Sequence, residues 1–274
     1  QFQTKVAELR TISQSADLTT RQWVEGLSKL SIEFGKPQID LAEAAYQSLS
    51  NQVTKGEETF EFLRSNAELA RTTVVSVTQA LDASSGVIKS FNLDLSQQHH
   101  VAAVLFKTVE LGRVKLDELS QTIGRVGPFA QSLGISFEEA SAAIATLTIK
   151  GIAAHEAITL LTNVMLHLIK PTDEMKKLLA EWGVTSGQQA LQAFRLGGVL
   201  QKIAIAANDD TKAFGELFGE LRATKGGLTL AADGANAFAD SLNKISDASI
   251  SYNKAKAEFQ DVNFEKFKSE TEKV

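Results

Sequence analysis

The chain has 274 residues, enough for one large domain or two of ordinary size. Hydrophobic residues make up 43% of it and charged residues 22%, which permits a buried core beneath a charged surface. The formal net charge of −5 argues against a dominant nucleic-acid surface, which needs a basic excess. There is no cysteine, so disulfides, thiolate chemistry and cysteine-ligated zinc are excluded.

Proline is scarce, occurring only at positions 37, 128 and 171, so the commonest helix breaker is nearly absent. We therefore predict an all-α fold: a multi-helix globular array of short helices and helical hairpins, leading into a longer coiled-coil-like helix at the C-terminus. The longest uncharged runs, 157–169 and 182–194, are too short for a membrane span, which needs roughly 20 apolar residues. The chain opens without methionine or an apolar signal region, which predicts a piece of a longer polypeptide or a processed product.

Residues 1–73 are predicted to form an N-terminal helical subdomain. Its helical stripes are separated by Phe34-Gly35-Lys36-Pro37, a helix stop followed by a turn, and by the Lys55-Gly56 break. The β-branched stretch 72–77 has no evident partner strand, so we assign it to a helix.

Residues 74–250 are predicted to form a helical core. In its first part, Ser84-Ser85-Gly86 and 92–96 have the composition of irregular connections. A helix containing Val101, Leu105 and Val109 is expected to end near Gly112.

The stretch 133–171 is predicted to be a helical hairpin with one shared core. Ser136 stands three residues before Glu139, the capping-box spacing that satisfies two free amides at a helix start. Gly151 suits the left-handed position after the first helix, and Pro171 cannot continue the second. The apolar faces of the hairpin contain Phe137, Ala140, Ile144, Leu147, Ile158, Leu161, Met165 and Leu168.

After the hairpin, Thr172 is a good N-cap and Gly183 a helix stop. A short helix is expected to end at Gly197-Gly198, and Asp209 or Asp210 to cap the next one. Gly226-Gly227 is expected to interrupt the chain again.

Residues 251–274 are predicted to start an extended helix or coiled coil. The stripe Tyr252, Ala255, Phe259 and Val262 follows 3-4-3 spacing between mixed charges, as at the start of a coiled coil.

The four histidines do not form a recognisable metal motif. His155-Glu156 begins like a zincin helix, but Thr159 occupies the position of the second histidine. His99 and His100 are adjacent and point about 100° apart on a helix, which is poor geometry for one ion. We expect neither a metal nor any other cofactor.

Carboxylates are the remaining candidates for chemistry, since glycoside hydrolysis needs only one or two of them. Glu138, Glu139 and Glu156 are the obvious candidates, but glutamates in a first helical turn are expected from the helix dipole alone. No phosphate-binding loop, nucleophile elbow or cysteine nucleophile occurs. We therefore predict no catalytic residue and a protein that is not an enzyme.

An ordered series of short motifs resembles the core helical region of phage tail tape measure proteins. The series runs from an LGIS segment and its glutamate, through a Gly-Ile pair and a Lys-Pro step, to a Trp-Gly-Val segment. Its residues are Leu133, Gly134, Ile135, Ser136, Glu139, Gly151, Ile152, Lys170, Pro171, Trp182, Gly183 and Val184. The sequence departs from the pattern at Ala153-Ala154, where a capping Ser or Asp is expected.

The resemblance implies a structural and assembly role in a phage tail, with the length of a longer helical polypeptide setting tube length in the tube lumen. It also implies ejection before the DNA, and presence in the host cytoplasm during assembly. The implied partners are further copies of the chain, tube and tip proteins and tail-assembly chaperones, with no specific nucleic acid. A membrane contact is expected only for other parts of the full-length protein. Two alternatives stay open here: a peptidoglycan-degrading module of a tail protein, and a membrane-active delivery module.

Overall fold

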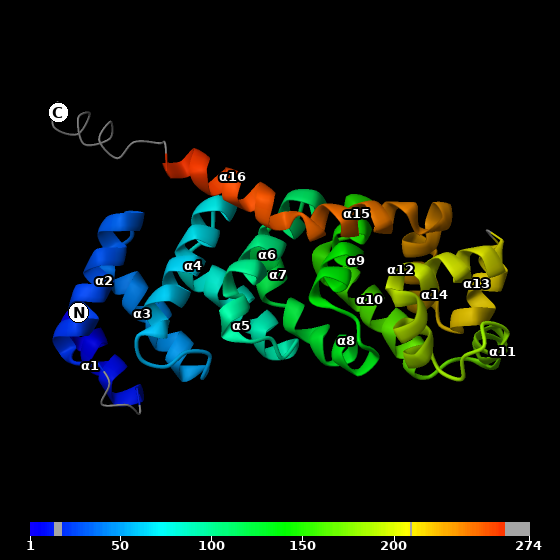
Figure 1. The fold of residues 1–274 in the computed structure, drawn as a ribbon, viewed down its shortest axis with the longest axis horizontal. Coiled ribbons are helices and arrows are strands. Elements are labelled where there is room, and N and C mark those ends of the chain that lie inside the picture. Colours follow the sequence, from blue (N-terminus) through cyan, green and yellow to red (C-terminus); the bar gives the residue numbers. More distant parts are fainter. Residues whose placement is uncertain (14–17, 209, 261–274) are drawn as a thin grey trace.

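The computed structural model describes residues 1–13, 18–208 and 210–260. Over these residues the chain forms sixteen α-helices and three short 3-10 helices, without a β-strand. The prediction of an all-α array is confirmed. The helices build an elongated molecule in which successive helices follow one another along the long axis (Figure 1).

The helices fall into an N-terminal and a C-terminal series. The first series comprises α1 (Phe2–Ile12), α2 (Thr20–Phe34), α3 (Gln38–Ser50), α4 (Glu58–Thr73), α5 (Val77–Ser90), η1 (Leu95–Gln97), α6 (Gln98–Gly112), α7 (Leu116–Ser120), η2 (Ile123–Arg125) and α8 (Gly127–Leu133). The second comprises α9 (Phe137–Ile149), α10 (Ala154–Ile169), α11 (Asp173–Glu181), α12 (Gly187–Ala207), α13 (Thr211–Phe218), α14 (Leu221–Ala231), η3 (Ala232–Ala235), α15 (Asn236–Ser246) and α16 (Ala248–Gln260).

The last two helices reverse the direction of the array. From α1 to α13 the chain advances from one end of the molecule to the other, and α15 and α16 then run back along one side (Figure 1). On this return α15 packs on α9 and α6, and α16 packs on α6 and α4. Segments far apart in the sequence are thereby joined, which ties the middle of the array together.

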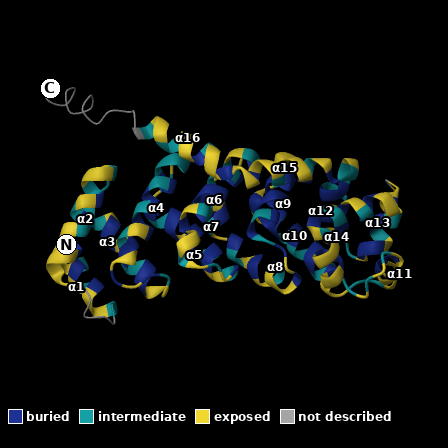
Figure 2. Ribbon diagram, in the orientation of Figure 1, coloured by how far each residue is buried: buried dark blue, intermediate teal, exposed yellow. Residues whose placement is uncertain are grey.

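A single apolar core runs the length of the molecule, visible as the buried inner faces of the helices (Figure 2). Near the N-terminal end it is built around Trp23, whose ring lies 5.0 Å from that of Phe60. Near the other end Phe218 and Phe238 are fully buried. Burial of this kind contributes about 25 cal/mol per Å² of apolar surface, so the long core is the main source of stability.

The helix boundaries that depend on local hydrogen bonds lie where the sequence places them. Ser136 and Glu139 form both hydrogen bonds of a capping box at the start of α9. The Thr172 hydroxyl accepts from the amide of Met175 and so caps α11. Gly35 and Gly151 have φ values of 62° and 87°, in the left-handed region that glycine enters without a steric penalty.

The helix end expected at Gly197-Gly198 lies next to a break in α12 at Arg195, whose backbone is not helical. Two other predicted interruptions were wrong, because each lies inside a helix: Ser84-Ser85-Gly86 belongs to α5 and Gly226-Gly227 to α14. The last pair shows the reason: a Cβ at Gly226 would lie 3.1 Å from the Leu160 carbonyl oxygen, and one at Gly227 would lie 2.3 Å from the Phe218 ring. Here glycine allows two helices to approach closely instead of ending one.

The assignment of 72–77 to a helix was also wrong in part. Helix α4 ends at Thr73, and Val74 adopts a left-handed conformation with φ 57°. The next helix starts after Ser76, whose side chain forms a capping box with Gln79. A local side-chain hydrogen bond therefore divides the segment between two helices.

The predicted C-terminal stripe falls partly on α16. Tyr252 is buried with its ring 5.5 Å from that of Phe106 on α6. The Phe259 carbonyl accepts a hydrogen bond from Arg71 on α4 at 2.6 Å. The stripe thus faces the array over the described part of α16, whereas Val262 and the rest of 261–274 lie outside the described residues.

Candidate functional site

The motif residues occupy three separate places. The group 133–139 forms the end of α8 and the start of α9, with Gly134 left-handed at φ 70° and Leu133 and Ile135 buried. The pair Gly151-Ile152 forms the turn between α9 and α10. The third group, Lys170-Pro171 and 182–184, flanks α11 beyond the far end of α10.

Glu139 is the centre of the first group and is only 3% exposed. Its Oε2 accepts from the Ser136 amide at 3.0 Å and from the Arg195 guanidinium at 2.8 Å. Its Oε1 accepts from the Leu196 amide at 3.0 Å. Since a buried charge is costly without partners, these three donors are what makes a carboxylate tolerable at this position.

The donors on α12 come from a kink in that helix. Arg195 has φ 57° and ψ 171°, which is not helical and lies in a region that is almost exclusively used by glycine. The distortion leaves the Leu196 amide free to point at Glu139 instead of at a carbonyl of its own helix. Glu139 therefore caps α9 and the second half of α12 at once.

The residue before the kink connects to the third motif group. The Phe194 ring meets the Trp182 ring edge-on at a centroid distance of 6.3 Å, and the Lys202 ammonium lies over both rings. Residues 194 and 195 thus join the first and third groups at one point, which we call the α12 junction. Gly151-Ile152 lies at the other end of α9 and is not part of it.

Sequence reasoning missed the part that α12 plays. Gly197-Gly198 directly follows the kink and was the available signal, but it indicated a helix end. Arg195 carried no signal of its own, because neither its conformation nor its partner 56 residues away is encoded locally.

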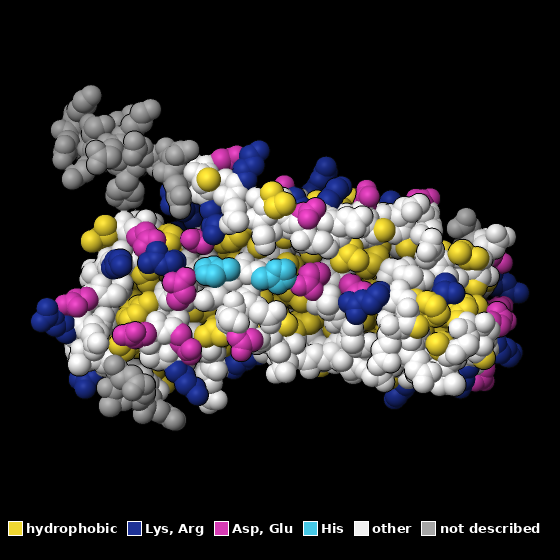
Figure 3. Space-filling model, in the orientation of Figure 1, with side chains coloured by type: hydrophobic (Ala, Val, Ile, Leu, Met, Phe, Trp, Pro, Cys, Tyr) yellow, Lys and Arg dark blue, Asp and Glu magenta, His cyan; other side chains and the backbone are white. Residues whose placement is uncertain are grey.

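A row of charged and titratable side chains crosses the start of α6. His99 bonds to Glu61 at 3.2 Å, and Arg64 pairs with both Glu61 and Glu33. His100 bonds to Glu138 at 2.5 Å. Histidines flanked by acidic and basic side chains are visible along the middle of this face (Figure 3).

The hydrogen-bond partners of Glu138 and Glu156 lower the pKa of both carboxyl groups. Burial works to raise the pKa of Glu138, but the hydrogen bonds from His100 and at the start of α9 outweigh it, so the pKa lies below its ordinary value. The hydrogen bond from Lys225 lowers the pKa of Glu156. A general acid in glycoside hydrolysis needs a raised pKa, so neither group is prepared for that role.

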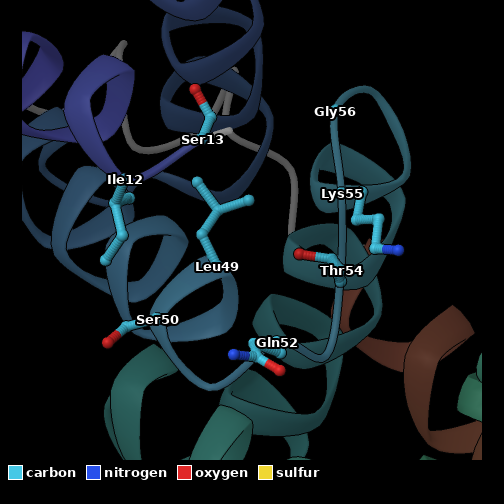
Figure 4. A pocket seen from close by; sticks show the side chains of 8 residues that line it. All are labelled: Ile12, Ser13, Leu49, Ser50, Gln52, Thr54, Lys55 and Gly56. Carbon is cyan, nitrogen blue, oxygen red and sulfur yellow. The ribbon is translucent and has the colours of Figure 1, made fainter. Parts of the chain in front are cut away.

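A pocket of about 420 Å³ (Figure 4) lies at the α1–α3 end of the molecule, away from α12 (Figure 1). Its lining is formed by Ile12, Ser13, Leu49, Ser50, Gln52, Thr54, Lys55 and Gly56. Lys55 is the one charged residue among them, and none of Glu138, Glu139 and Glu156 contributes. Among the described residues, the pocket therefore does not bring together an acid and a base.

Residues 1–13, 18–208 and 210–260 contain neither a metal-binding cluster nor a helix that could span a membrane. No group of three histidine, aspartate or glutamate side chains lies close enough to hold a metal ion within these ranges. No helix in the described part of the chain has the length and apolar character of a membrane span.

Comparison with known proteins gives one family and two relatives. Residues 25–219 match the family described as phage-related minor tail protein. The probable tape measure protein of Clostridium phage phiCD119 is 24% identical over 256 residues, which is 90% of this chain and 27% of the relative. The tape measure protein of Pneumococcus phage Dp-1 is 24% identical over 188 residues, or 68% of this chain and 16% of the relative. The chain thus spans about a quarter or less of these curated relatives, and no solved structure matches it.

Proposed function

Because this chain belongs to the phage-related minor tail protein family and resembles tape measure proteins, we propose that it is a module of a protein that sets tail length from within the tail tube. Its role in the phage tail is structural. The observation that carries the proposal is the family match over 25–219, which runs from within α2 to the end of α13. The match covers most of the helical array and is not confined to one motif.

The physical properties of the array support a structural role. Its carboxylate candidates are held in contacts between helices: Glu138 with His100, Glu139 with Arg195, and Glu156 with Lys225. Such pairs position helices relative to one another and leave no free acid–base pair among these three groups. The peptidoglycan-degrading alternative thereby loses its best candidates.

The ruler function belongs to the longer protein, since this chain corresponds to 27% or 16% of its relatives. A helical polypeptide rises about 1.5 Å per residue, so its length converts directly into distance. A folded array such as α1–α16 spans a shorter distance than the same residues would in one continuous helix. In this proposal the array is a globular section, and rod-like sections measure the tube.

The proposal includes partners and a sequence of locations. Copies of the protein lie side by side along the tail axis, contact tube and tip proteins, and are bound by chaperones in the host cytoplasm during assembly. They leave the tail ahead of the DNA. The net charge of −5 is compatible with a place in the tail lumen, because a mildly acidic chain has little affinity for DNA.

Electron microscopy of phage particles tests the ruler. In-frame deletions in rod-like helical regions of the full-length parent are expected to shorten tails by about 1.5 Å per deleted residue. Replacing a deleted segment with an unrelated helical segment of equal length is the control and should restore tail length. Unchanged tail length in the deletion particles overturns the proposal.

A further inference from the structure

The α12 junction contains a helix in a conformation that its own sequence does not favour. Among the 21 residues of Gly187–Ala207, Arg195 alone interrupts the helical backbone, with φ 57° and ψ 171°. A side chain in this region of backbone space is strained, and such strain persists only where surrounding contacts hold it.

Glu139 supplies the principal contact. Its two carboxylate oxygens bind the Arg195 guanidinium and the Leu196 amide, the two groups that the kink turns outward. In a straight α12 the Leu196 amide would instead donate to the carbonyl four residues earlier, at Gln192. The Glu139 contact and the regular helical hydrogen bond therefore exclude each other.

Gly198 shows a second exclusion. A Cβ placed on Gly198 would lie 3.1 Å from the Cβ of Phe194, closer than side chains normally approach. In a straight helix the Cβ atoms of residues four apart are about 5–6 Å from each other. Glycine at 198 is thus suited to the kinked form, whereas alanine is suited to the straight one.

We propose that α12 is a two-state element, with the kinked form latched by Glu139 and a straight helix over Gly187–Ala207 as the alternative. The half after the kink is held in the core, where a Cβ added at Gly197 would lie 3.2 Å from the Phe238 ring. The half before it carries Phe194 and, through Trp182, the end of α11. Straightening changes the direction of the first half of α12 relative to the second, and with it the position of Trp182 at the end of α11, so the array changes shape at this end.

Distance measurement between two spin labels tests the proposal, and the absence of cysteine makes the labelling specific. Gln188 and Ala206 are exposed and 18 residues apart, so Gln188→Cys and Ala206→Cys place labels on one face of a straight helix. The axial separation in the straight form is about 27 Å, and the kinked form gives a shorter distance. The otherwise unchanged chain is expected to show mainly the shorter distance.

Three substitutions shift the two forms in stated directions. Gly198→Ala crowds Phe194 in the kinked form and favours helix elsewhere, so the longer distance should become the major one. Glu139→Gln weakens the latch and should also raise the longer distance. Arg195→Gly removes one donor to Glu139 and keeps the Leu196 one, but it also removes the backbone strain of the kink and disfavours the straight helix, so only the shorter distance should remain. Gly215→Ala, in α13 with no atom within 4 Å of the added Cβ, is the control and should change nothing.

The outcome that overturns the proposal is a single short distance in both Gly198→Ala and Glu139→Gln while circular dichroism shows both folded. If either variant fails to fold, Arg195→Gly replaces it, compared with the unsubstituted chain in the same distance measurement. The longer distance present in the unsubstituted chain is expected to disappear in Arg195→Gly. Identical distance distributions in the two chains also overturn the proposal.

Discussion

Helices α9 and α16 each contain 13 residues and both pack on α6, yet they are held in different ways. In α9 eleven residues are buried, whereas in the described part of α16 only Ala248 and Tyr252 are. The difference follows from position. Helix α9 lies between α6, α10 and α15 in the middle of the array, and α16 lies on its outer side.

The buried helix contains serine, threonine and glutamate side chains that are shielded from water, whereas the described part of the outer helix does not. Polar side chains inside α9 need partners, and its threonines use the backbone: Thr146 donates to the Ala142 carbonyl and Thr148 to that of Ile144. Helix α16 instead uses contacts at the rim, with Lys256 paired to Glu68 and Arg71 bonded to Phe259. We therefore expect α9 to share the global stability of the protein and α16 to open more easily.

The largest effect should come from the core face of α9. Leu147→Ala removes a fully buried side chain and is expected to lower the free energy of unfolding by about 2–5 kcal/mol. Urea denaturation measures this. Ile149→Ala, two residues along the same helix and 49% exposed, is the matched control and should change it by at most about 0.5 kcal/mol. Equal effects of the two substitutions would remove the shared-core interpretation.

The N-terminal caps of α9 and α10 give a smaller, paired effect. Ser136→Ala removes the hydroxyl that accepts from the Glu139 amide and should cost about 1 kcal/mol. Ala153, exposed at the N-cap of α10, makes no side-chain hydrogen bond, so Ala153→Ser should increase thermal stability by a similar or smaller amount. A loss of stability in Ala153→Ser would show that its local geometry does not allow a cap.

On α16 the Lys256–Glu68 pair should contribute less. A double-mutant cycle with Lys256→Ala and Glu68→Ala is expected to give a coupling energy of at most about 1 kcal/mol, decreasing with added salt. Amide exchange should show α16 opening with a lower free energy than α9 in the unsubstituted chain. Identical protection of the two helices would contradict the comparison drawn above.

The smallest effect concerns pH at the start of α9. The folded pKa of Glu138 lies below its ordinary value of 4.5, so the carboxylate stabilises the fold above that pH and loses this contribution as pH falls below it. Between neutral and acid pH, the free energy of unfolding of Glu138→Gln should therefore fall less than that of the unsubstituted chain, by less than about 1 kcal/mol. Urea unfolding of both chains between about pH 3 and about pH 6 tests the sign. A stability advantage of the unsubstituted chain that grows toward low pH would contradict the prediction.

Much of the helical framework could be predicted from the sequence, because a helix end is a local event. Ser136 with Glu139, Thr172, and Gly35 each satisfy backbone groups within a few residues of themselves, so their positions can be recognised without the fold. The division at residues 73 and 250 stays a prediction. The importance of the motif residues likewise stays a prediction, and their grouping in space was not foreseeable from the sequence.

Tertiary structure decided which helices meet and what the glycines do. Glycine disfavours helix locally, so Gly226-Gly227 predicts a break, whereas close packing against Leu160 and Phe218 places both glycines inside α14. The same is true of the α12 junction, where Glu139 was recognisable as a cap but its bond to Arg195 was not. The sequence by itself thus determined the helix ends that carry a side-chain cap or a left-handed glycine, since those hydrogen bonds close over three or four residues. The kink, the return of α15–α16 and the helix partners depend on contacts between distant segments, whose energies exist only once the chain has folded.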